Sequence, residues 1–100
     1  MKNVILSADG DSVVYSVPND VADNLADYCM RFCSDWLPNS PDAAKYRLKG
    51  TLCYDETDFI EYLNLYIFPD QKSEFVTNLG WIGSGTNYPN EYKDCSKFNF

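Results

Sequence analysis

The sequence predicts an α+β fold, a single small domain over residues 1–100. About three strands should form an antiparallel sheet, with two main helices packed on one of its faces. Two observations predict the strands: apolar and polar residues alternate on both sides of Asp9-Gly10, and they alternate again over 46–54. A third predicts the helices, because segments 20–37 and 56–68 repeat apolar residues at three- and four-residue spacing. The length of 100 residues, 45% of them apolar, suits one modest core.

The N-terminal segment predicts a β-hairpin that turns at Asp9-Gly10, a residue pair typical of two-residue hairpin turns. Such a turn pairs Leu6 with Val13 and places a set of apolar residues on one face. These are Val4, Leu6, Val13, Tyr15 and Val17. The opposite face carries Ile5 and Val14 among serine and asparagine residues, so we expect it to be partly exposed to water.

A first helix should begin with Asn19 or Asp20 as its cap and end before Pro38. Its apolar stripe consists of Val21, Leu25, Tyr28, Phe32 and Trp36. The opposite side of the helix carries a row of carboxylates, formed by Asp20, Asp23, Asp27 and Asp35. Only Arg31 interrupts this acidic row, four residues after Asp27, where the two side chains can pair.

A third strand is predicted over 46–54, with Gly50 marking a bulge or a close approach of the backbone. The only basic cluster of the chain lies at the start of this strand. This cluster comprises Lys45, Arg47 and Lys49.

The second helix should begin at Asp55, with Asp58 in the position of the return partner in a capping box, and end at Pro69. Its core face comprises Phe59, Tyr62, Leu63, Tyr66 and Ile67. Its other face mixes acidic and apolar residues: Asp58, Glu61, Leu65 and Phe68. Leu65 and Phe68 either form an exposed anchor for a partner or lie beneath the C-terminal segment.

After this helix, residues 73–80 predict a short helix capped by Ser73 and closed by Gly80, with a strand as the alternative. The segment of about 83–100 has an irregular pattern but is rich in aromatic residues. We therefore expect it to pack across the domain rather than to form a disordered tail.

The composition offers little for catalysis. No histidine is present, so the commonest general base is missing, and we expect a protein that is not an enzyme and needs no cofactor. The cysteines are Cys29, Cys33, Cys53 and Cys95. Their spacing favours reduced packing residues, while a metal site and a disulfide remain as alternatives.

Fifteen acidic residues against eight basic ones give a net charge of −7. This charge argues against direct binding to nucleic acid or to an anionic membrane, and it suits a protein partner with a basic surface. The first apolar run is too short for a signal peptide, which predicts a cytoplasmic location.

The sequence thus favours a small non-catalytic inhibitor or antagonist, of the immunity or anti-defence type. Its target would be a basic, nucleic-acid-handling protein. The chain would occupy the basic surface of this target by mimicking nucleic acid. The predicted partner-binding residues are Asp20, Asp23, Asp27, Asp35, Asp58, Glu61, Leu65 and Phe68. The alternative is a small enzyme or a cysteine-ligated metal module.

Overall fold

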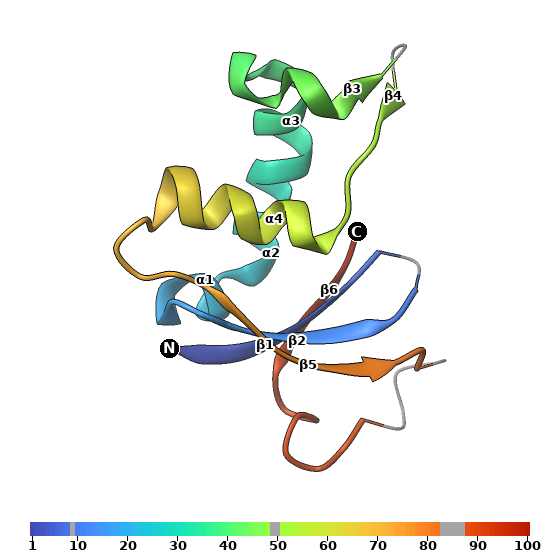
Figure 1. Ribbon diagram of the computed structural model, residues 1–100. Helices are drawn as coiled ribbons and strands as arrows, with labels where there is room; N and C mark the ends of the chain where they lie inside the picture. Colours follow the sequence, from blue (N-terminus) through green and yellow to red (C-terminus); the bar gives the residue numbers. More distant parts are fainter. Residues whose placement is uncertain (9, 49–50, 83–87) are drawn as a thin grey trace.

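The computed structural model describes residues 1–8, 10–48, 51–82 and 88–100. It confirms the α+β class: the helices all lie on one side of a sheet (Figure 1). The sheet has four strands in the order β5–β2–β1–β6, one more than the roughly three expected, and β1 and β6 run parallel. Its strands are β1 (Lys2–Ser7), β2 (Ser12–Val17), β5 (Glu74–Gly80) and β6 (Ser96–Asn99).

The N-terminal hairpin forms in the predicted register. Val4 pairs with Tyr15 and Leu6 with Val13, while Asp9 of the turn lies outside the described residues. The opposite face is partly exposed, as predicted: Asn3 is exposed and Ser7 and Ser16 are half-buried, although Ile5 and Val14 are only 2% and 0% exposed. Residues 88–95, which precede β6, run along that side of the sheet, away from the helices (Figure 1).

The first helical region is divided into four pieces. They are α1 (Asn19–Asp23), α2 (Leu25–Met30), the π-helical turn η1 (Arg31–Trp36) and α3 (Leu37–Asn39). The backbone leaves helical geometry at Asn24, with φ −130° and ψ 39°. The predicted cap at Asn19 or Asp20 is wrong: the N-cap position is Pro18, and no side chain caps the helix there.

The prediction that this helix ends before Pro38 is also wrong. A proline is tolerated in the first turn of a helix, where its missing N–H would have no partner within that helix. Pro38 occupies that position in α3, directly after the π-helical turn. The helical path therefore continues to Asn39, and the Ser40 N–H closes it by donating to the Trp36 carbonyl at 2.9 Å.

The single strand predicted over 46–54 is wrong as well. The residues form the end of a 3₁₀ helix, η2 (Pro41–Tyr46), and a separate two-stranded hairpin of β3 (Arg47–Leu48) and β4 (Thr51–Leu52). An alternating pattern does not reveal whether a strand continues or folds back on itself. The bulge predicted at Gly50 and the side chain of Lys49 lie outside the described residues.

Arg47, from the predicted basic cluster, has a structural role. Its Nη1 donates to the carbonyl oxygens of Leu37 at 2.7 Å and Ser40 at 2.9 Å. It thus ties the β3–β4 hairpin to the end of α3, where helix carbonyls otherwise lack partners.

The second helical region comprises α4 (Glu56–Tyr62) and the π-helical turn η3 (Leu63–Ile67), and its predicted capping box is confirmed. The Asp55 carboxylate accepts from the N–H groups of Thr57 and Asp58, at 3.0 and 3.3 Å. The Asp58 carboxylate in turn accepts from the Asp55 N–H at 2.9 Å.

We expect Asp55→Ala to lower the free energy of unfolding by about 1 kcal/mol, the usual cost of losing an N-cap. Urea unfolding followed by circular dichroism measures this change. Asp55→Asn keeps a side-chain acceptor and should recover most of the loss. An unchanged stability in Asp55→Ala would contradict a role for the capping box.

Residues 74–80 form strand β5 rather than the expected short helix, so the alternative reading was the correct one. Asn64 of η3 fixes the entry to this strand: its side chain accepts from the Ser73 N–H at 2.7 Å and donates to the Ser73 carbonyl at 3.0 Å. Pairing with β2 then holds the segment extended, and Gly80 ends it with φ 76°. Tertiary hydrogen bonding has overridden the local helix signal.

The aromatic C-terminal segment packs on the domain as expected, but its end forms a strand. β6 pairs with β1, and the Phe100 N–H donates to the Ser7 carbonyl at 2.9 Å. Phe98 and Phe100 pack against the core.

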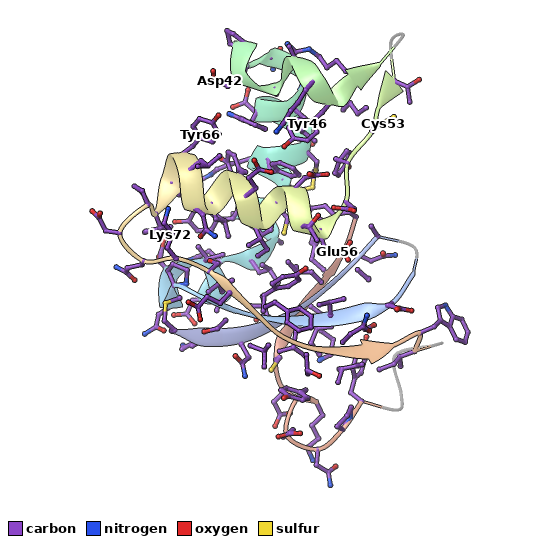
Figure 2. All side chains as sticks on the ribbon, viewed as in Figure 1. Asp42, Tyr46, Cys53, Glu56, Tyr66 and Lys72 are labelled. Atoms are coloured by element: carbon purple, nitrogen blue, oxygen red, sulfur yellow. The ribbon has the colours of Figure 1, made fainter. Side chains whose placement is uncertain are left out.

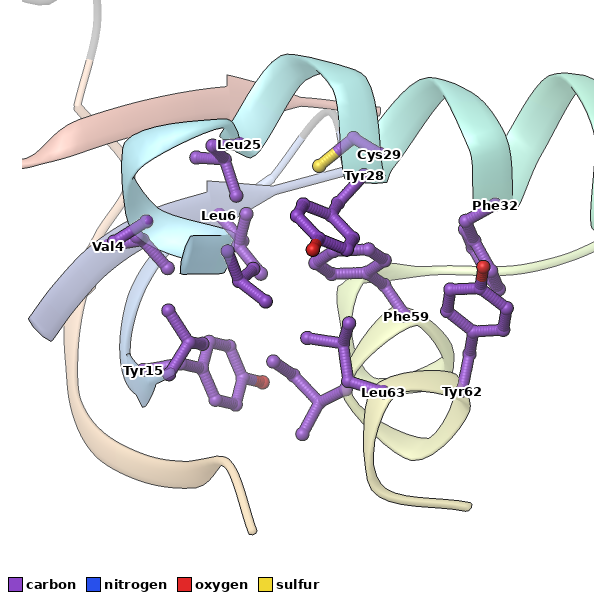
Figure 3. Close-up of a cluster of buried hydrophobic side chains, with 14 of the residues drawn as sticks. Val4, Leu6, Tyr15, Leu25, Tyr28, Cys29, Phe32, Phe59, Tyr62 and Leu63 are labelled. Carbon is purple, nitrogen blue, oxygen red and sulfur yellow. The ribbon is translucent and has the colours of Figure 1, made fainter. Parts of the chain in front are cut away.

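The core lies between the sheet and the helices (Figure 3). Phe32 is fully buried at its centre, and its ring lies 5.5 Å from Phe59 and 5.1 Å from Tyr62. The aromatic residues predicted to face inward from both helical regions therefore meet one another directly.

Candidate partner-binding surface

The acidic row on the first helical region is divided between separate helices by the break at Asn24. Asp20 and Asp23 belong to α1, Asp27 to α2 and Asp35 to η1. All four side chains are exposed to solvent. Their charges can therefore still attract a basic partner over a distance, although they do not form one straight row.

Three of these four carboxylates already have polar partners. Asp20 accepts hydrogen bonds from the Tyr28 hydroxyl and, at 3.2 Å, from Asn24 Nδ2. Asp23 forms an ion pair with Lys2 at 2.6 Å. Asp35 accepts from Asn39 Nδ2 at 3.3 Å.

The expected pair between Asp27 and Arg31 is not among the ion pairs of the described residues. The Arg31 guanidinium carbon lies 5.2 Å from the centre of the Tyr28 ring instead. The hydrogen bond to Asp20 raises the pKa of the Tyr28 hydroxyl, and burial adds to the shift. A tyrosine hydroxyl is protonated at neutral pH, so Tyr28 is the donor and the Asp20 carboxylate is the acceptor.

A groove opens between the second helical region (α4 and η3) and the segments η1 and η2, and Trp36 of η1 forms part of its wall. The cavity there has a volume of about 130 Å³. It is lined by Trp36, Asp42, Lys45, Tyr46, Glu61, Tyr62, Leu65 and Tyr66. We call this cavity the Trp36 groove; Figure 2 labels Asp42, Tyr46 and Tyr66 around it.

Aromatic rings make up much of the wall of the Trp36 groove. The Trp36 ring centre lies 5.0 Å from Tyr62, 5.3 Å from Tyr66 and 6.0 Å from Tyr46. Tyr46 and Tyr62 are buried, whereas Trp36 is half-buried and Tyr66 exposed. The groove therefore presents tryptophan and tyrosine surface to solvent beside the carboxylates of Asp42 and Glu61.

A cation of the chain itself lies at this groove. Lys45 Nζ is 5.0 Å from the centre of the Tyr46 ring and 3.5 Å from Glu61 Oε1. Interaction with the Tyr46 side chain raises the pKa of Lys45, and the charge of Glu61 raises it further. The Lys45 ammonium group therefore lies where the face of the Tyr46 ring and the Glu61 carboxylate both attract positive charge.

A second cavity, of about 310 Å³, shares the Trp36 and Tyr62 side chains with the groove. Arg31 and Asp35 contribute its charged lining. Asp35, Glu61 and Leu65, three of the predicted partner-binding residues, therefore lie around one aromatic cluster. Asp58 is not among the lining residues of either cavity; its carboxylate accepts from the Asp55 N–H in the capping box.

Leu65 is exposed, as an anchor for a partner must be, whereas Phe68 is not. Leu65 is 54% exposed, and Tyr66 and Ile67 beside it are also exposed. Phe68 is half-buried, but its ring contacts Tyr28, at 6.2 Å between ring centres. Phe68 thus belongs with Asp20 and Tyr28, away from the Trp36 groove.

The cysteines differ in environment. Cys29 is fully buried in the core, and burial raises the pKa of its thiol. Cys33 packs partly against the core, whereas Cys53 is exposed and Cys95 half-buried at the surface. The prediction that the cysteines are packing residues therefore holds only for Cys29 and Cys33. Among the described residues, no group of three or more histidine, cysteine or acidic side chains is placed to hold a metal ion.

Sequence reasoning missed Asp42 and Lys45 as groove residues and assigned Trp36 and Tyr66 wholly to core faces. Their spacing does place them on apolar faces, but the two helical regions bury only part of those faces against each other. A local signal for Lys45 did exist, because it is the first residue of the only basic cluster.

Comparison with known protein families, with curated proteins and with solved structures found no match. Over the described part of the chain, no helix has the length and apolar character needed to cross a membrane.

Proposed function

We propose that the chain is a small acidic, non-catalytic binding protein that occupies the basic surface of a protein partner and thereby inhibits it. The observation that carries the proposal is the juxtaposition at the Trp36 groove of exposed apolar side chains, Leu65 and Tyr66, with the carboxylates of Asp42 and Glu61, while Asp35 lines the cavity beside it. An apolar centre with a charged rim is the usual composition of a protein interface.

The net charge of −7 supports the same proposal. Complementary charge speeds the encounter of two proteins and selects against the wrong partners. A nucleic-acid-handling protein, such as a nuclease or a defence effector, is the partner class with the strongest basic surface. The exposed carboxylates on the helices would there take the place of nucleic-acid phosphates, in the cytoplasm.

The test begins with capture of the partner from an extract of the source organism by the immobilised chain. The captured protein is identified by mass spectrometry, and the kinetics of binding are then measured with the purified partner. We expect the Asp27→Lys/Asp35→Lys double variant to associate roughly tenfold more slowly at low salt, with a weaker dependence on salt. Its thermal unfolding should stay nearly unchanged, because both side chains are exposed.

The matched control is Asp11→Lys/Glu74→Lys, which changes the net charge equally at exposed positions just before β2 and at the start of β5, outside the predicted partner-binding residues. This control should associate at close to the wild-type rate. A wild-type rate in Asp27→Lys/Asp35→Lys would reject the acidic surface. Equal slowing in the control would mean that net charge alone matters.

A further inference from the structure

The Trp36 groove has the chemistry of a receptor for one cationic side chain. The faces of tryptophan and tyrosine rings attract cations, and tryptophan does so most strongly. Carboxylates of Asp42 and Glu61 add acceptors with formal negative charge. Lys45 demonstrates the preference within the chain, because its ammonium group lies over Tyr46 and beside Glu61.

The volume of the groove admits a guanidinium group, and its aromatic wall favours one over an ammonium group. At about 30 Å³ per water molecule, its 130 Å³ corresponds to roughly four water-sized groups, enough for the four heavy atoms of a guanidinium. A guanidinium is planar and less strongly hydrated than an ammonium group, so it can lie against a ring while donating to carboxylates.

We propose that the Trp36 groove binds an arginine side chain of the partner, held between the aromatic wall and the carboxylates of Glu61 and Asp42. This inference rests on the proposed function and names the chemistry that the partner must present. Lys45 occupies part of the same electrostatic site, so it competes with the incoming arginine. Removing the Lys45 charge therefore strengthens arginine binding, while neutralising Glu61 weakens it.

A small probe tests the groove without the partner. The chain has two tryptophans, and Trp81 is 74% exposed, so Trp81→Phe leaves Trp36 as the only indole signal without disturbing the core. In this background, N-acetyl-arginine amide is titrated while the Trp36 indole N–H resonance and the tryptophan fluorescence are recorded. The comparison probes are N-acetyl-lysine amide and N-acetyl-citrulline amide, the second of which has nearly the shape of arginine without its charge.

We expect a saturable shift of the Trp36 resonance with arginine, a clearly weaker one with lysine and none with citrulline. Glu61→Gln should weaken arginine binding about threefold and Lys45→Met should strengthen it about threefold, in line with a partly exposed cation–π and ion-pair site. The matched controls, Glu91→Gln and Lys93→Met, carry the same charge changes in the segment between β5 and β6 and should leave the affinity unchanged.

Three results would overturn the inference: no saturable shift with arginine, an equal shift with citrulline or lysine, or equal affinities in Glu61→Gln and the wild type. These outcomes are separate from failure of the proposed function. If the chain captures no basic partner, the proposed function fails even where arginine binds. If a basic partner is captured but arginine leaves Trp36 unaffected, only this inference fails.

Discussion

Phe32→Ala should lower the free energy of unfolding by about 3–5 kcal/mol, a large part of the stability of a small domain. Phe32 is fully buried, and five aromatic rings have their centres 5.1 to 6.0 Å from its own. These rings belong to Trp36, Tyr54, Phe59, Tyr62 and Phe100. They come from both helical regions, from the segment between β4 and α4 and from the C-terminus, so the cavity left by alanine cannot close by the movement of one element.

The matched control is Phe75→Ala on β5. This phenylalanine is 61% exposed and contacts Tyr15 edge-on, at 6.2 Å between ring centres. We expect its replacement to cost no more than about 1 kcal/mol. Urea unfolding, followed by circular dichroism, measures both variants. Equal losses in the two variants would contradict the placement of Phe32 at the centre of the core.

The second large effect is a difference in stability between two substitutions of apolar residues near the end of the second helical region. Phe68→Asp should lower the free energy of unfolding by about 2–4 kcal/mol, because the ring contact with Tyr28 is lost and a charge is placed at a half-buried position. Leu65→Asp should cost no more than about 1 kcal/mol, because Leu65 is largely exposed.

Both substitutions add a negative charge near the C-terminal end of a helix, where the helix dipole disfavours it. This unfavourable effect is shared, so the difference between the two variants reports the packing of Phe68. Leu65→Asp should therefore remain folded and be suitable for binding measurements with the partner, in which we expect faster dissociation. Similar melting temperatures for the two variants would contradict the separation of Phe68 from the exposed surface.

The surface predicted from sequence is only partly brought together by the fold. Glu61 and Leu65 line the Trp36 groove and Asp35 lines the cavity beside it, because the second helical region packs beside the end of the first. Asp20 and Phe68 lie around Tyr28 instead, and Asp23 pairs with Lys2. Helical periodicity predicts which side of a helix a residue occupies, but it cannot reveal a break at Asn24 or which helices lie side by side.

The sequence by itself determined the features that depend on neighbouring residues. The hairpin register follows from the alternating pattern around Asp9-Gly10, and the start of α4 follows from the Asp55–Asp58 capping box. The apolar stripes of both helical regions likewise predicted that Phe32, Phe59 and Tyr62 face the core.

Only the tertiary structure decided the features that depend on distant segments. Residues 74–80 became a strand because β2 offers its edge and Asn64 holds Ser73 extended, although Ser73 and Gly80 locally resemble the ends of a helix. β6 pairs with β1 from the opposite end of the chain, and no local pattern records that pairing. The Trp36 groove also arises only when two helical regions meet, because a cavity is a property of the space between elements rather than of either one.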